Sequence, residues 1–239
     1  MSLFPFFVIL GLLPSTIWLL FYLRRDKRPE PNGMVIKIFL FGMLSTIPAV
    51  LIEWPFKDLL EKTSWSPLVV SIVYFLIAVA LTEELLKFLV FKLSVEPNQE
   101  FDEPVDAMIY MIIIGLGFAA VENILILFSL TQPYLIEKTT FALLGRFAGA
   151  TFLHALCSAN IGFFFALSLF KTRKRKLLLL IGLSLSILLH TAYNLIITME
   201  GNAKFGLIAI LLTSLFLIVL FQFYKIKQLP SVCRVKTKK

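Results

Sequence analysis

Residues 67–91 read PLVVSIVYFLIAVALTEELLKFLVF, an apolar run that is interrupted by Glu83, Glu84 and Lys87. A helix needs roughly 20 apolar residues to cross the hydrocarbon core of a bilayer, so the length of this run predicts a membrane-spanning helix. Its three charged side chains are costly there, at about 2.5–3.5 kcal/mol each on insertion scales. The run therefore indicates both the class of fold and the region in which a function should be sought.

The whole chain has the composition of a membrane protein. Of its 239 residues, 59% are hydrophobic and 16% are charged, and the mean hydropathy is +0.89. A soluble domain has about 45–50% apolar and about 25% charged residues, so the soluble globular class is excluded. The high apolar fraction excludes disorder, and the presence of only 2 cysteines excludes a disulfide scaffold.

Outward from residues 67–91, the same pattern recurs along the chain. We predict an all-α, polytopic helical bundle with about seven transmembrane helices, at residues 3–23, 35–53, 67–91, 105–130, 141–170, 177–198 and 204–224. The first stretch lacks the basic start and the small-residue cleavage pattern of a signal peptide, so we expect it to be retained as a helix. One transmembrane domain over residues 1–228 and a basic cytoplasmic tail over 229–239 are expected.

The positive charges predict the orientation. Of the 23 Lys and Arg residues, 16 fall on one side of the seven-span arrangement and 4 on the other. Because cytoplasmic loops carry the excess of Lys and Arg, the N-terminus should lie outside and the C-terminus in the cytoplasm. The charges are divided into short runs between apolar stretches, which excludes a nucleic-acid-binding face. We expect a multi-pass protein of the bacterial cytoplasmic membrane, with the lipid bilayer as its surroundings.

Four consecutive spans carry polar side chains at bilayer depth. Both histidines of the chain belong to this set, which comprises Glu83, Glu84, Lys87, Glu122, Asn123, His154, Asn160, His190 and Asn194. Ionisable residues inside a membrane span usually mark a function. Taken singly, however, each has a structural alternative: the Glu83 and Lys87 side chains could form a buried ion pair, and an isolated His or Asn often forms an interhelical hydrogen bond.

The spacing of these residues predicts which of them share a helix face. Lys87 lies four residues after Glu83 and three after Glu84, so its ammonium can reach either carboxylate. Successive helical residues diverge by about 100°, so we expect only one of the two carboxylates to point at a shared centre. At 1.5 Å per residue, Glu83 and Glu122 should differ in depth by roughly 10 Å, and bringing them together requires a tilted or bent helix.

At this point the motifs resemble a known family. In order and spacing, Glu83-Glu84-Leu85-Leu86-Lys87, Phe118-Ala119-Ala120-Val121-Glu122-Asn123, His154 and His190-Thr191-Ala192-Tyr193-Asn194 resemble elements of the PrsW intramembrane proteases, which are relatives of the CAAX-processing and bacteriocin-processing membrane endopeptidases. Residues 25–31 and 100–106 also resemble that family's first and third loops. The resemblance implies that residues 1–228 form a protease domain.

The resemblance also implies an activity and a set of site residues. The activity is hydrolysis of a peptide bond in a membrane-bound substrate with a transmembrane segment, as in the first cut of an anti-sigma factor. Glu83 would be the general base, Glu84 would orient it, and His190 and Asn194 would hold the oxyanion. Glu122 stands where the CAAX relatives carry a histidine, and His154 could substitute for that group. Lys87, Phe118 and Asn123 would support the site.

Two alternatives stay open. The first concerns the mechanism: we favour hydrolysis by glutamate without a cofactor, although His154, His190 and Glu122 would make a sufficient ligand set for zinc with Glu83 as the base. The family that these motifs resemble is itself commonly described as metalloprotease. The second concerns the function, because a proton- or ion-coupled transporter would also use Glu, His and Asn side chains along a path through its helices. A non-catalytic scaffold could bind membrane helices through the same polar groups.

Overall fold

The computed structural model describes residues 4–24, 30–129 and 144–231, and these residues are helical apart from short connections. Seven of the described helices are long and apolar enough to cross a membrane. The elements are α1 (Phe4–Leu23), α2 (Asn32–Glu61), α3 (Pro67–Val73), the π-helix η1 (Tyr74–Leu81), α4 (Thr82–Ser94), α5 (Asp106–Ser129), α7 (Ala150–Phe170), the short η2 (Thr172–Lys174), α8 (Arg175–Ile197) and α9 (Ala203–Ile226).

The predicted all-α fold with seven spans is confirmed, and most of the span boundaries agree within a few residues. The largest difference is at α2, which was expected to end near residue 53 and continues to Glu61. Lys57 and Glu61 are paired at 3.9 Å on its exposed last turns, which supports this polar extension. Glu53 therefore lies inside a helix and faces neighbouring helices, whereas the sequence placed it at the end of a span.

Some predictions concern features that the described residues do not include or that a single chain does not define. The first-loop motif at 25–29 and tail residues 232–239 lie outside the described residues. The membrane orientation and the domain boundary at residue 228 stay predictions.

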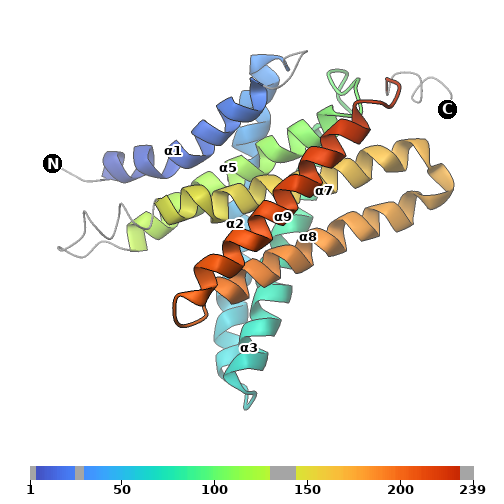
Figure 1. Ribbon diagram of the computed structural model, residues 1–239. Coiled ribbons are helices and arrows are strands. Elements are labelled where there is room, and N and C mark those ends of the chain that lie inside the picture. Colours follow the sequence, from blue (N-terminus) through green and yellow to red (C-terminus); the bar gives the residue numbers. More distant parts are fainter. Residues whose placement is uncertain (1–3, 25–29, 130–143, 232–239) are drawn as a thin grey trace.

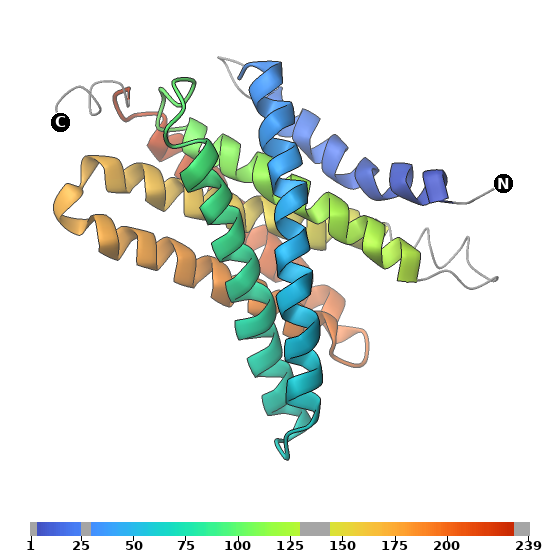
Figure 2. The same cartoon turned by 180° about the vertical axis from the view of Figure 1, so that it is seen from behind.

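Helices α5 and α7 form the centre of the bundle. In the most apolar part of these two spans, 67% and 72% of the residues are buried, against 22–33% in the other five spans. Helices α1 and α2 pack on α5, and α8 and α9 pack on α7. Figures 1 and 2 show α2 and the α3–η1–α4 segment as an antiparallel pair that crosses the other helices steeply. The tilt that is needed to bring Glu83 and Glu122 together is thus a tilt of this whole helix pair.

Glycines allow the central helices to approach one another closely. A Cβ atom added at Gly117 of α5 would collide with the Phe39 carbonyl oxygen of α2, and one added at Gly115 would collide with the Ser158 hydroxyl of α7. These two glycines of the span before Glu122 thus let α2 and α7 pack closely on α5. Close backbone approach of this kind is a common basis of helix packing in membranes, where burial from water contributes little.

The third loop, whose sequence resembles the family motif, is held by Asp106 and joined to the first loop by Tyr110. The Asp106 carboxylate accepts hydrogen bonds from the backbone amides of Asp102 (3.1 Å) and Glu103 (2.7 Å). The Tyr110 hydroxyl donates to the Glu30 carboxylate, which precedes α2. These bonds fix the start of α5 and thereby the position of the residues further along it.

A buried polar network joins α7, α8 and α9. The Asn160 side-chain amide donates to the Ser186 hydroxyl (3.0 Å) and to the Gly182 carbonyl oxygen (3.2 Å), and its oxygen accepts from the Gln222 amide (2.8 Å). The Ser186 hydroxyl in turn donates to the Cys157 carbonyl oxygen at 2.9 Å. Asn160 therefore forms interhelical hydrogen bonds, which is the structural alternative considered for an isolated Asn.

Replacing Asn160 by leucine is expected to lower the free energy of unfolding by about 1–3 kcal/mol, because buried partners on two helices would lose their hydrogen bonds. Denaturation of the purified protein in detergent, followed by circular dichroism, measures this change. Ser168→Ala is the matched control, since the Ser168 hydroxyl donates to the Phe165 carbonyl oxygen of its own helix. Equal losses of stability in the two variants would contradict the interhelical role.

Candidate active site

Both glutamates of the quoted stretch point at the same lysine. The Lys87 ammonium lies 3.2 Å from Glu83 Oε2 and 2.8 Å from Glu84 Oε1, and all three side chains are at most 1% exposed. The expectation that only one carboxylate would reach a shared centre is wrong. The side chains are long enough to converge on Lys87 from adjacent helical positions, so a compact buried group of three charges results.

The π-helix η1 leads directly into this group. In its wider turn the Thr82 hydroxyl donates to the Ile77 carbonyl oxygen, five residues earlier, at 3.2 Å. A π-helical segment changes the angular register of the residues that follow, and such segments occur frequently at functional sites. Helix α4 resumes at Thr82 and presents Glu83 and Glu84 from its first turn.

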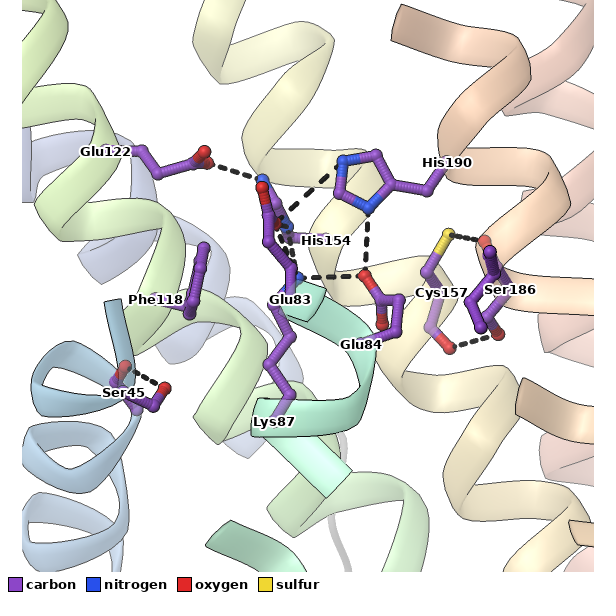
Figure 3. Close-up of polar contacts among 12 residues, drawn as sticks. Ser45, Glu83, Glu84, Lys87, Phe118, Glu122, His154, Cys157, Ser186 and His190 are labelled. Atoms are coloured by element: carbon purple, nitrogen blue, oxygen red, sulfur yellow. Dashed lines mark hydrogen bonds and ion pairs between the residues drawn. The ribbon is translucent and has the colours of Figure 1, made fainter. Parts of the chain in front are cut away.

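The two histidines approach the group from α7 and α8. The His154 Nδ1 atom lies 2.8 Å from Lys87 Nζ, and the His190 Nδ1 atom lies 3.0 Å from Glu84 Oε1. The imidazole rings are 5.0 Å apart and nearly perpendicular. In Figure 3 the Lys87 side chain lies below His154 and the His190 ring lies above Glu84. The sequence-predicted residues on α4, α7 and α8 therefore converge.

These contacts determine which ring nitrogens carry protons. An ammonium group has three donors and no acceptor, so His154 Nδ1 accepts from Lys87, and the His154 proton is on Nε2. The His190 Nδ1 atom faces the Glu84 carboxylate and is therefore a donor. The other ring nitrogen of His190, Nε2, lies 4.0 Å from Glu83 Oε2.

Glu122 completes the site at its more exposed edge. Its Oε2 atom accepts from His154 Nε2 at 2.6 Å and from Arg146 Nη2 at 3.1 Å. Its side chain is 24% exposed, whereas those of Glu83 and His154 are buried. His154 thus lies between Glu83 and Glu122, 3.8 Å from the first and 2.6 Å from the second. The sequence placed these two carboxylates at different depths, and they meet because the pair formed by α2 and α3–η1–α4 crosses α5 and α7 steeply.

The supporting residues Phe118 and Asn123 also lie beside the site. The Lys87 ammonium is 4.5 Å from the centre of the Phe118 ring, a cation–π contact, and that ring is 5.8 Å from the His154 ring. The Asn123 amide donates to the Thr151 hydroxyl at 3.1 Å, and its oxygen accepts from the Arg146 guanidinium. Arg146 therefore holds both Glu122 and Asn123, a role that the sequence analysis did not assign.

Asn194 is less closely connected. It is half-buried on α8, one turn after His190, and among the described residues it has no hydrogen bond or ion pair with the other site residues. Glu53 of α2 was missed by the sequence analysis because it stands at the predicted edge of a span. It is half-buried and interacts electrostatically with Glu122 and Lys87. A carboxylate within an otherwise apolar helix was the signal that could have found it.

The donor atoms suit a divalent metal. Among the described residues, Glu83, Glu84, His154 and His190 each offer a ligand atom within 4.8 Å of the others, which is the mixture of imidazole and carboxylate that zinc accepts. The Glu84 Oε2 atom is buried and has no hydrogen-bond partner among the described residues, so it is available to a cation. Glu122, which the sequence analysis proposed as a ligand, is instead bonded to His154 and Arg146.

Comparisons with known proteins agree with this architecture. The family model described as "PrsW family intramembrane metalloprotease" matches residues 30–223. The chain is 32% identical over 174 residues to "Protease PrsW" of Geobacillus kaustophilus, covering 73% of this chain and 71% of that protein. It is 30% identical over 183 residues to "Protease PrsW" of Bacillus subtilis, covering 76% and 78% of the two chains. No solved structure matches the chain.

Proposed function

Because the chain belongs to the PrsW family of intramembrane metalloproteases, we propose that it cleaves a membrane-bound protein at the cluster of Glu83, Glu84, Lys87, His154 and His190. The chain is a multi-pass membrane hydrolase that acts on protein. We further propose that its substrate has a single transmembrane segment, as an anti-sigma factor has, and that hydrolysis occurs among the helices.

One observation carries the proposal: Glu83 lies beside the Lys87 ammonium and within 4.0 Å of a nitrogen atom of each imidazole. Its Oε2 atom is 3.2 Å from Lys87 Nζ, 3.8 Å from His154 Nδ1 and 4.0 Å from His190 Nε2. Both distances to the imidazoles are longer than a hydrogen bond, so neither ring bonds Glu83 directly. Glu83 can therefore bond a water molecule, as a general base requires. We propose that Glu83 takes a proton from the attacking water.

The other residues have distinct roles in this scheme. Glu84 holds the His190 ring through Nδ1, so that Nε2 faces Glu83. The proton that Glu83 accepts from water can pass to His190 Nε2, and the imidazolium formed donates to the oxyanion of the tetrahedral intermediate together with the Asn194 amide. Return of that proton to the departing amine completes the hydrolysis. Lys87 contributes a fixed positive charge opposite the developing negative charge.

Glu122 and His154 would fix the geometry at the exposed edge. Glu122 accepts from His154 Nε2, so His154 Nδ1 remains directed at Lys87 and Glu83. Arg146 holds Glu122 in turn. Since Glu122 is the most exposed acidic member of this group, we propose that water and the substrate backbone approach from its side.

The metal that the family description implies would fit this cluster. The residues that would hold it are His154, His190 and Glu84, whose free Oε2 atom is suited to a cation, and Glu83 would remain the base. Carboxylates on the second ring nitrogens, Glu122 for His154 and Glu84 for His190, are the usual support of metal-binding histidines. When bound, the metal polarises the scissile carbonyl and makes water more acidic. Lys87 would have to release His154 Nδ1. His190 Nε2 would then be a ligand, so Glu83 itself would return the proton to the departing amine.

We expect the purified protein to cleave a single-span substrate in detergent, and His190→Asn to lower the rate about 10²-fold or more. Asparagine can keep a donor near Glu84 but removes the Nε2 atom that serves the proton transfer. The measurement is the rate of product formation on a gel. Thr191→Ala is the matched control, since the Thr191 hydroxyl bonds the Ile187 carbonyl oxygen of its own helix.

The same assay tests the metal. We expect a chelator to abolish cleavage and stoichiometric zinc to restore it, because the donor set and the family description now favour the metal-dependent form over the cofactor-free form favoured from sequence. Full activity in metal-free protein would show that Glu83 acts without a metal. Unchanged cleavage in His190→Asn would exclude the proposed site, and proton-coupled uptake into vesicles without cleavage would favour the transporter alternative.

A further inference from the structure

A cleft of about 400 Å³ lies between the ends of α1, α5 and α9, away from the protease site. It is lined by Tyr22 of α1, Ile109 of α5 and Val219 of α9, with Lys227 at the end of α9. Ile109 and Glu122 are 13 residues apart on α5, about 20 Å along the helix, so this cleft is separate from the cluster around Glu83. Its volume lies in the range of small-molecule sites.

The walls of the cleft are apolar and partly open to the membrane. Phe21, Phe216 and Phe223 line it, and Leu220, which is 47% exposed, lies on its wall. Among the described lining residues no side chain is acidic. A hydrocarbon chain from the surrounding bilayer suits such walls, since an apolar surface at membrane depth is covered by lipid.

Tyr22 and Lys227 are the polar side chains among the described residues that line the cleft, and they indicate what the rest of the ligand is. The Tyr22 hydroxyl is buried and has no hydrogen-bond partner among the described residues. A buried hydroxyl without a partner costs free energy, so a ligand oxygen that accepts from it would be favoured. Lys227 is exposed and, within the described part of the chain, forms no ion pair. An ester or phosphate oxygen near Tyr22 and an anion near Lys227 would satisfy both groups.

The position of the cleft across the membrane also favours an anionic lipid. The C-terminal ends of α1 and α9 and the N-terminal end of α5 meet here, at the side where the excess of Lys and Arg predicts the cytoplasm. Arg24 adds positive charge at the end of α1. Basic residues near the anionic cytoplasmic leaflet attract anionic lipid headgroups. We propose that the cleft binds one anionic phospholipid, with an acyl chain between the aromatic walls and its phosphate at Lys227.

The test is the binding of phosphatidylglycerol to the delipidated full-length protein, measured by native mass spectrometry in detergent. Phosphatidylcholine with the same acyl chains should bind more weakly. Lys227→Gln should weaken phosphatidylglycerol binding about fivefold, as expected for one basic residue, and Tyr22→Phe should weaken it by a similar factor through the lost hydrogen bond. Neither side chain contacts the protease cluster.

Matched controls make the result specific to the cleft. Lys225 is at the same end of α9, but its ammonium lies over the Phe221 ring at 5.4 Å and does not line the cleft, so Lys225→Gln should leave binding unchanged. Leu220→Trp should fill the cleft and abolish binding, whereas Leu217→Trp, at a 59% exposed position of the same helix outside the cleft, should not. Equal binding of the two lipids, or equal effects of Lys225→Gln and Lys227→Gln, would overturn the proposal.

This inference does not depend on the proposed protease mechanism. Binding should be identical in a Glu83→Gln background, in which we expect cleavage to be lost. Loss of lipid binding in that background would show that the cleft is not an independent site. If the protease mechanism failed, the lipid measurement would still decide the role of this cleft.

Discussion

Replacing Lys87 by methionine is expected to lower the free energy of unfolding by about 3–5 kcal/mol, the largest stability change of any single substitution considered for this protein. The Lys87 ammonium is the partner of two carboxylates at 3.2 and 2.8 Å, and none of the three side chains is more than 1% exposed. Methionine keeps much of the volume of lysine but leaves two adjacent buried carboxylates without a counter-charge. Denaturation in detergent with chelator present, so that no metal replaces the ammonium, measures the loss.

Two further variants separate the charge from the volume. Lys92→Met, on the same helix, removes a partly exposed ion pair with Glu96 and should cost less than about 1 kcal/mol. Combining Lys87→Met with Glu83→Gln and Glu84→Gln should recover much of the lost stability, because the buried carboxylates are then neutral amides. If Lys87→Met and Lys92→Met were equally stable, Lys87 would not be the central counter-charge of the cluster.

Replacing Glu83 by glutamine is expected to lower the rate of substrate cleavage about 10²–10⁴-fold, the range of a lost general base. Glutamine keeps the shape of the side chain but cannot accept a proton from water. Removing one carboxylate from the Lys87 group leaves Glu84 as its partner, so the fold should persist. Single-turnover cleavage of a single-span substrate, with enzyme in excess, reports the chemical step without the contribution of product release.

Glu84→Gln is the comparison that assigns the roles of the two neighbouring glutamates. It removes the carboxylate that orients His190 and that would hold a metal, while Glu83 remains able to accept the proton. We therefore expect the metal content to fall in Glu84→Gln and to be retained in Glu83→Gln. Retained cleavage in Glu83→Gln with complete loss in Glu84→Gln would exchange the two roles.

The helical spans could be predicted closely from sequence because membrane insertion depends on a local property. About 20 apolar residues suffice for a crossing whatever the rest of the chain does, and backbone groups in lipid must bond within their own helix. The span from Asp106 to Ser129 is an example, since its predicted limits were 105 and 130. The extension of α2 to Glu61 was not predicted, because it is polar and reaches beyond the apolar stretch.

The members of the site were also largely predictable, because charged side chains inside apolar helices are few. Glu83, Glu84, His154 and His190 were identified for this reason, and the structure brings them together. Arg146 and Glu53 were overlooked because each stands near the edge of a span, where a charged residue is ordinary. The helical spacing placed Asn194 on the same stripe of its helix as His190, but helical spacing does not determine a partner on another helix.

The sequence by itself thus determined a seven-span membrane protein and the identity of its costly buried side chains, since both follow from transfer free energies of single residues and short segments. The tertiary structure alone decided their pairing. Lys87 binds both glutamates and His154, and Glu122 binds His154 and Arg146, because the pair of α2 and α3–η1–α4 crosses the central helices steeply and glycines let the backbones approach. Such contacts depend on helix tilt and register, which sequence distance does not encode.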